Sequence, residues 1–222
     1  MFAAVNTNSI NVFNFYTGEC TNDYIFKEHK GKVGSVSWFE DDSGFVSAGL
    51  DGLIYVWDLH NSNRADYCFK NKGTNFACIE KTPDPVCKIY ACGTDKTLRE
   101  ITYEPENDKD EEGKEKSEYM LAKGGGKDQK QTLDAKEKRR YESSCQFAAV
   151  VVLKEGRGLI VGTGDNDRPG QISIFRLEAL ELVFTIQAHS LPITRLQLNF
   201  DNSHLFSASK DGSVGIFEIK DS

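Results

Sequence analysis

Residues 45–58 place two short apolar runs on either side of a polar turn. Val46 in the first run and Ile54 and Val56 in the second follow the period-two spacing of a pleated strand with one buried face. An Asp-Gly pair at positions 51 and 52 separates the runs. A glycine there can adopt the positive φ that closes two strands at no steric cost. The pattern therefore predicts two strands joined by a tight turn.

The second predicted strand ends on Trp-Asp, and a histidine precedes the first strand, which is the signature of a WD repeat, one blade of a β-propeller. The same signature recurs near the end of the chain. The first set is His29, Ser47, Asp51 and Trp57, and the second is His189, Ser207, Asp211 and Phe217. The last three positions of each set follow its histidine by 18, 22 and 28 residues. This agreement indicates repeated blades.

Two weaker copies lie between these sets. One covers 89–101 and keeps the turn aspartate as Asp95, with Gly73 and Ala91 where the first copy has its histidine and serine. The other covers 159–175 with a longer turn. Residues 9–14 resemble the strand that carries the tryptophan and give a partial copy.

The predicted fold is therefore all-β: residues 1–222 form a WD-repeat β-propeller segment of four recognisable blades plus a partial one. The pattern starts near the second strand of a blade and stops after the third strand of another. Because ring closure is what removes exposed sheet edges, we expect this segment to be part of a larger propeller.

The repeat pattern stops between residues 104 and 142, where an acid-rich half precedes a base-rich half. Such a composition buries too little apolar area to order a core, so we expect a solvated insertion between blades. A short exposed helix over 128–140 is a weaker alternative, because Asp134 stands four residues before Lys138. Without the insertion, the middle blades return to about 40 residues per repeat.

A serine, a histidine and an aspartate in one repeat also suggest a nucleophilic triad. The structural interpretation is stronger, because an active site is rarely duplicated within one chain. We predict that both sets form buried hydrogen-bonded chains that tie loops to strands and that must be fully satisfied to rigidify a blade. No catalytic residue is assigned, and the chain is not expected to be an enzyme.

Signals for metals and cofactors are weak. Cys87 and Cys92 lack a second ligand pair at zinc spacing. Residues 165–167 offer carboxylate and amide oxygens without the acidic residue that closes a calcium loop. Residues 124–127 lack the leading glycine and the Ser/Thr of a phosphate-binding loop. We expect neither a metal nor a cofactor.

The bulk properties point toward protein partners. A formal net charge of −7 argues against nucleic acid or an anionic membrane as the main partner. No apolar run approaches the roughly 18 residues of a membrane span, and the N-terminus lacks a secretory signal pattern. Six scattered cysteines are expected to be buried free thiols. Function on such scaffolds lies in the loops, and the 104–142 insertion is the first candidate for a partner contact. The alternative is that the insertion is a disordered loop without a function of its own.

Four ordered phrases, at 10–17, 28–33, 93–101 and 187–194, resemble the cilia- and flagella-associated protein 57 family. That resemblance implies WD-repeat propellers followed by a long coiled coil, located in the axoneme of motile cilia and flagella as an adaptor for inner dynein arms. This chain is similar to the closing part of the second propeller. No heptad run follows Ile219, so the oligomerising coiled coil is absent from this chain. The alternative is a cytoplasmic WD-repeat adaptor, such as a ubiquitin-ligase substrate receptor.

Overall fold

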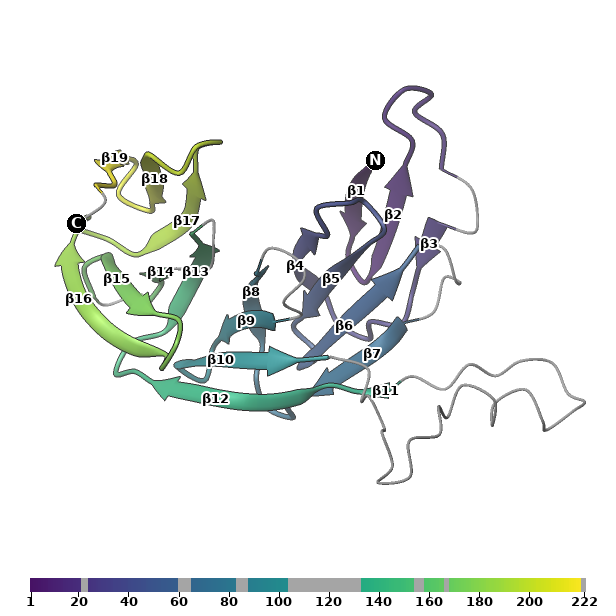
Figure 1. Ribbon diagram of the computed structural model, residues 1–222, viewed down its shortest axis with the longest axis horizontal. Coiled ribbons are helices and arrows are strands. Elements are labelled where there is room, and N and C mark those ends of the chain that lie inside the picture. The colour runs from purple at the N-terminus through teal and green to yellow at the C-terminus, as the bar shows by residue number, and fades with distance from the viewer. Residues whose placement is uncertain are drawn as a thin grey trace, which may run out of the picture.

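The computed structural model describes residues 1–20, 24–59, 65–82, 88–103, 133–153, 158–165 and 168–220. Its elements are β-strands, which form five separate sheets along an open arc (Figure 1). Among these residues, no helix has the length and apolar character needed to cross a membrane.

We name the sheets A to E in chain order. Sheet A contains β1 (Phe2–Asn6), β2 (Ser9–Phe13) and β3 (Ile25–Phe26). Sheet B contains β4 (Val33–Trp38), β5 (Gly44–Gly49), β6 (Leu53–Asp58), β7 (Ala65–Lys70) and β11 (Leu133–Asp134). Sheet C contains β8 (Phe76–Lys81), β9 (Lys88–Gly93), β10 (Thr97–Thr102) and β12 (Lys136–Glu142).

Sheet D contains β13 (Phe147–Val152), β14 (Gly158–Thr163), β15 (Gln171–Arg176) and β16 (Glu181–Gln187). Sheet E contains β17 (Ile193–Leu198), β18 (His204–Ser209) and β19 (Val214–Glu218). The first strands of neighbouring sheets contact one another, β4 with β8, β8 with β13 and β13 with β17, so they line the inner side of the arc. The predicted all-β propeller segment is confirmed, with sheets B to E as the four blades and sheet A as the partial one.

The predicted hairpin at 45–58 is β5–β6, in which Phe45 faces Trp57 and Val46 faces Val56. Gly52 closes its turn with a φ of 77°. This positive φ is the conformation for which a glycine in the turn was expected.

The prediction that 104–142 lies outside the blades is wrong for its last part. Lys136–Glu142 forms β12, the outer strand of sheet C, and pairs antiparallel with β10. The alternative of a helix over 128–140 is wrong for the same residues. Residues 104–132 lie outside the described part of the chain.

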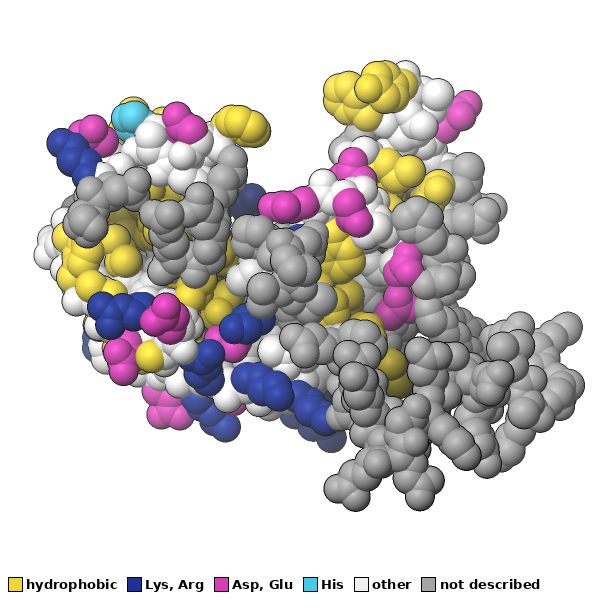
Figure 2. All heavy atoms as spheres, in the orientation of Figure 1, with side chains coloured by type: hydrophobic (Ala, Val, Ile, Leu, Met, Phe, Trp, Pro, Cys, Tyr) yellow, Lys and Arg dark blue, Asp and Glu magenta, His cyan; other side chains and the backbone are white. Residues whose placement is uncertain are grey.

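The charge alternation in β12 explains this correction. Glu137, Arg139 and Tyr141 are half-buried, whereas Lys136, Lys138 and Arg140 are exposed. Because the pairing with β10 shifts between Glu100 and Ile101, Glu137 lies on one face of sheet C and Arg139 and Tyr141 lie on the other. The inward charges find partners, since Glu137 accepts a hydrogen bond from Arg99 at 2.8 Å. Figure 2 shows Lys and Arg side chains along the lower side of the molecule, where Figure 1 places β12.

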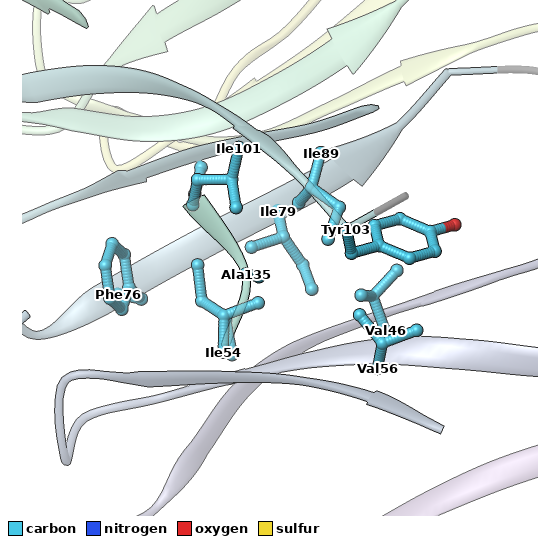
Figure 3. Close-up of a cluster of buried hydrophobic side chains, with 11 residues drawn as sticks. Val46, Ile54, Val56, Phe76, Ile79, Ile89, Ile101, Tyr103 and Ala135 are labelled. Atoms are coloured by element: carbon cyan, nitrogen blue, oxygen red, sulfur yellow. The ribbon is translucent and has the colours of Figure 1, made fainter. Parts of the chain in front are cut away.

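Apolar clusters between neighbouring sheets hold the arc together. Figure 3 shows the cluster between sheets B and C, to which sheet B contributes Val46, Ile54 and Val56. Ala135, which lies between β11 and β12, joins the same cluster and is 9% exposed. The residues that bridge the two outer edges are therefore anchored in the core.

Candidate functional site

Four polar side chains form a continuous hydrogen-bonded chain in sheet B. The Asp51 carboxylate lies 3.1 Å from His29 Nδ1, and His29 Nε2 lies 2.8 Å from Ser47 Oγ. Trp57 Nε1 donates to the same oxygen at 2.8 Å. With the proton on Nδ1, the imidazole donates to Asp51 and accepts from the Ser47 hydroxyl, so that all four groups are satisfied. The chain joins the segment before β4 to the β5–β6 hairpin.

This order of aspartate, histidine and serine matches that of a hydrolytic triad, but its surroundings exclude that chemistry. A nucleophile must reach its substrate, whereas Ser47 is 0% exposed and its oxygen already accepts from Trp57. Burial lowers the pKa of His29, and Asp51 offsets only part of that shift. We infer that this hydrogen-bonded chain of side chains has a structural role.

Sheet E contains the second predicted set. His189 Nε2 lies 2.6 Å from Ser207 Oγ, and its Nδ1 lies 3.4 Å from an oxygen of Asp211. Nδ1 also lies 2.9 Å from Ser213 Oγ, a contact that the first set lacks. Phe217 stands where the tryptophan would be and has no N–H to donate. The structure thus brings the predicted residues of each set together, with one donor fewer in sheet E.

Sheet C carries a charged version of the chain that the sequence analysis missed. Arg99 donates to the Asp95 carboxylate through Nη2 and to Glu137 through Nε at 2.8 Å. Thr74 Oγ1 donates to Asp95 at 2.8 Å. Arg99 is 4% exposed, so its charge is compensated inside the protein. The sequence contained one sign of this network, because Arg99 stands within an apolar strand pattern, four residues after the turn aspartate Asp95.

Equivalent positions in sheets B and C explain how an arginine takes the place of the histidine. Arg99 faces Ala91 across β9–β10, just as Tyr55 faces Ser47 across β5–β6. In sheet B the tyrosine ring packs edge-on against the His29 ring, with centroids 4.9 Å apart. Where the histidine is absent, the longer guanidinium reaches into the space beside the turn aspartate.

The weak metal signals gain no support from the described residues. These contain no group of three or more His, Cys, Asp or Glu side chains that could hold a metal ion. Cys92 is fully buried, and burial raises the pKa of its thiol well above the ordinary value. Cys87 and residues 124–127 and 166–167 lie outside the described part of the chain.

A groove of about 480 Å³ lies where the inner strands of sheets B to E end. Glu80 in its wall accepts a hydrogen bond from Ser37 Oγ at 2.8 Å, and burial raises the pKa of that carboxyl group. The lining mixes polar residues such as Glu80 and Gln197 with apolar residues such as Val151 and Leu198.

Comparison with known families supports the repeat assignment. The WD40 family (WD domain, G-beta repeat) matches residues 19–58 and 180–218, the two stretches that carry the histidine-containing sets. The chain is also similar in structure to the Myceliophteria thermophila Cps50 (Swd1) β-propeller domain, with a TM-score of 0.75 and 16% identity over 98% of this chain and 62% of that one. At that identity the likeness concerns the fold alone.

Relatives in sequence include proteins that are ciliary by name. Cilia- and flagella-associated protein 57 C of Tetrahymena thermophila is 29% identical over 99% of this chain and 16% of its own length. Cilia- and flagella-associated protein 57 of Mus musculus is 27% identical over 100% of this chain and 15% of its length. Cilia- and flagella-associated protein 52 of Chlamydomonas reinhardtii is 24% identical over 90% of this chain and 27% of its length.

This chain therefore spans about a sixth of the length of the first two relatives. The match to them covers the whole set of sheets, including the charged stretch between the third and fourth strands of sheet C. The chain is a WD-repeat β-propeller segment that is similar, over nearly its whole length, to cilia- and flagella-associated protein 57.

Proposed function

We propose that this chain is a non-enzymatic protein-interaction scaffold of motile cilia or flagella, acting in the axoneme as an adaptor for inner dynein arms. The observation that carries the proposal is the similarity to ciliary relatives across all five sheets. The burial of the histidine and the serine in each of the two sets supports a scaffold, because neither Ser47 nor Ser207 can meet a substrate.

The arrangement of surfaces supports the same proposal. Propeller blades hold their loops and edges rigidly, so a partner that binds them loses little conformational entropy of the scaffold. Exposed cations on β12 lie beside half-buried ion pairs, which fixes the orientation of that edge. Rigid edges and loops of this kind suit an adaptor that positions larger assemblies.

The proposal is tested with the full-length protein in a ciliated cell. We expect the tagged protein to remain with axonemal microtubules after detergent removes the ciliary membrane. Axonemes from cells that lack the protein should lose inner-arm dyneins and keep outer-arm dyneins. A protein that stays in the cell body, with dynein content unchanged on its removal, would refute the proposal and favour an adaptor of another cytosolic complex.

A further inference from the structure

The outer strand of each blade leaves a row of backbone N–H and C=O groups that can recruit another strand. Among the described residues, sheets B, C and D have at least four strands and hence a complete outer edge. In sheet B, β11 occupies that edge. In sheet C, β12 presents Lys136, Lys138 and Arg140 and has a bulge against β10, both of which are features that protect an edge.

Strand β16, the outer edge of sheet D, also has a bulge, opposite Ile174 and Phe175, but lacks the row of charged side chains that protects β12. All seven of its residues are exposed, and residues 182–186 contain no charge. Its apolar side chains are exposed by 41% at Leu182, 53% at Val183, 47% at Phe184 and 37% at Ile186. Figure 2 shows hydrophobic side chains at the left edge of the molecule, where Figure 1 places β16. An uncharged run with high β-propensity is what a docking strand requires.

The apolar side chains of β16 continue rows that begin in the core. Phe184 faces Ile174 and Ile186 faces Ile172 across β15–β16. Ile172 and Ile174 belong to the cluster between sheets D and E. These rows run outward to β16 and end there in exposed side chains, so a further strand would extend them.

The backbone at this edge is also available. Ala188 N–H donates to the Gly170 carbonyl at 2.9 Å, on the β15 side. Because amides alternate in direction along a strand, those of Thr185 and Gln187 point away from β15. They lie on the outer edge, where an added strand would pair.

Sheet B shows that a blade of this fold accepts such a strand. Leu133 and Asp134 pair parallel with Tyr67 and Cys68 of β7. Ala135 N–H then donates to the Cys68 carbonyl at 2.9 Å. A segment distant in sequence has thus added itself to the outer edge of a blade.

We propose that β16 is a docking edge for an extended, predominantly apolar segment of a partner protein, which pairs with its outer backbone and covers Phe184 and Ile186. This inference rests on the scaffold role proposed above and names the surface that serves it. Backbone pairing supplies affinity, and the alternating side chains supply specificity. A strongly charged segment is disfavoured, because its charges would be buried without partners.

The test uses the full-length protein and a synthetic peptide of residues 170–177, the sequence that already pairs with β16 on its inner side. We expect the peptide to slow hydrogen exchange at the Thr185 and Gln187 amides by about tenfold or more. Phe184→Lys and Val183→Lys should remove this protection. Leu191→Lys, a matched control at 44% exposure outside β16, should keep it.

Absence of protection in the unmodified protein, or equal protection in the β16 variants, would overturn the docking edge. Protection that grows with protein concentration in the absence of peptide would assign the edge to a second copy and also overturn the proposal. The ciliary experiment is read separately. Normal axonemal retention without peptide protection refutes the docking edge alone, and loss of retention with normal protection refutes the ciliary role alone.

Discussion

Arg99 donates a hydrogen bond to Asp95 in sheet C at the place where His29 contacts Asp51 in sheet B. The two side chains differ in reach. An imidazole connects two groups, whereas a guanidinium has five donors in a fixed fork, and Arg99 also binds Glu137 on the outer strand. In sheet C the Arg99 side chain therefore connects the turn aspartate to the outer strand β12. In sheet B the His29 side chain connects the turn aspartate to Ser47 in the interior.

Replacing Arg99 by methionine should destabilise the protein by about 3 kcal/mol, because the Asp95 and Glu137 carboxylates lose their buried partner. Arg140→Met is the matched control. Arg140 also pairs with Glu137, at 2.9 Å, but its side chain is 60% exposed, so its loss should cost less than about 1 kcal/mol. Urea unfolding measures both changes, and equal losses would contradict the buried role of Arg99.

His29→Ala should lower the free energy of unfolding by roughly 1–3 kcal/mol, because Ser47 loses a partner inside the protein. His204→Ala serves as the control. His204 is half-buried and bonds locally to Ser203, so a smaller change is expected. If both variants have the same thermal unfolding midpoint as the parent, the hydrogen-bonded chain around His29 has no structural role.

Stability should fall in mild acid. Burial lowers the pKa of His29 below its ordinary value of 6.5, so the unfolded state takes up a proton first as the pH drops. The contribution of His29 is therefore complete above pH 6.5 and is lost progressively as the pH falls from there toward the lowered pKa. Urea midpoints at about pH 7.5 and about pH 5 should differ less in His29→Gln than in the parent. Parallel pH profiles would contradict the assignment.

Two glycines in equivalent turns should respond differently to alanine. Gly52 and Gly212 have φ angles of 77° and 81°, and an alanine at either would incur about 1–2 kcal/mol of backbone strain. A Cβ at Gly52 would also lie 2.4 Å from the Asn71 carbonyl oxygen, whereas none of the described atoms lies within 4 Å of a Cβ at Gly212. Gly52→Ala should therefore unfold at clearly lower urea than Gly212→Ala. Equal urea midpoints would contradict this prediction, because they would mean that the backbone at Asn71 moves away from the new Cβ at little cost in free energy.

The repeat pattern was readable from the sequence because hydrogen-bonded chains impose fixed separations. A histidine before β4 can meet Ser47 and Asp51 only if the strands between them have set lengths. The same lengths recur around His189 in sheet E, so four positions sufficed to identify two blades.

Strand β12 was not readable in the same way, because its charged residues resemble a solvated segment. Its inward charges become intelligible only once Arg99 and Glu100 are known to face them, at 2.8 Å from Glu137 and 3.5 Å from Arg139. The Arg99 network was missed for a related reason. A search for a repeated histidine cannot find a different chemical group that fills its place from another strand.

Residues 133–142 run from the outer edge of sheet B to the outer edge of sheet C, with Ala135 buried between them. A backbone cut between residues 103 and 133 would therefore yield two fragments, each lacking what the other supplies. The N-terminal fragment has three strands of sheet C, and the C-terminal fragment has the fourth. Co-expressed halves should therefore reassemble by strand complementation and co-purify. The chain would then serve as a split protein whose two fragments complete each other's sheet.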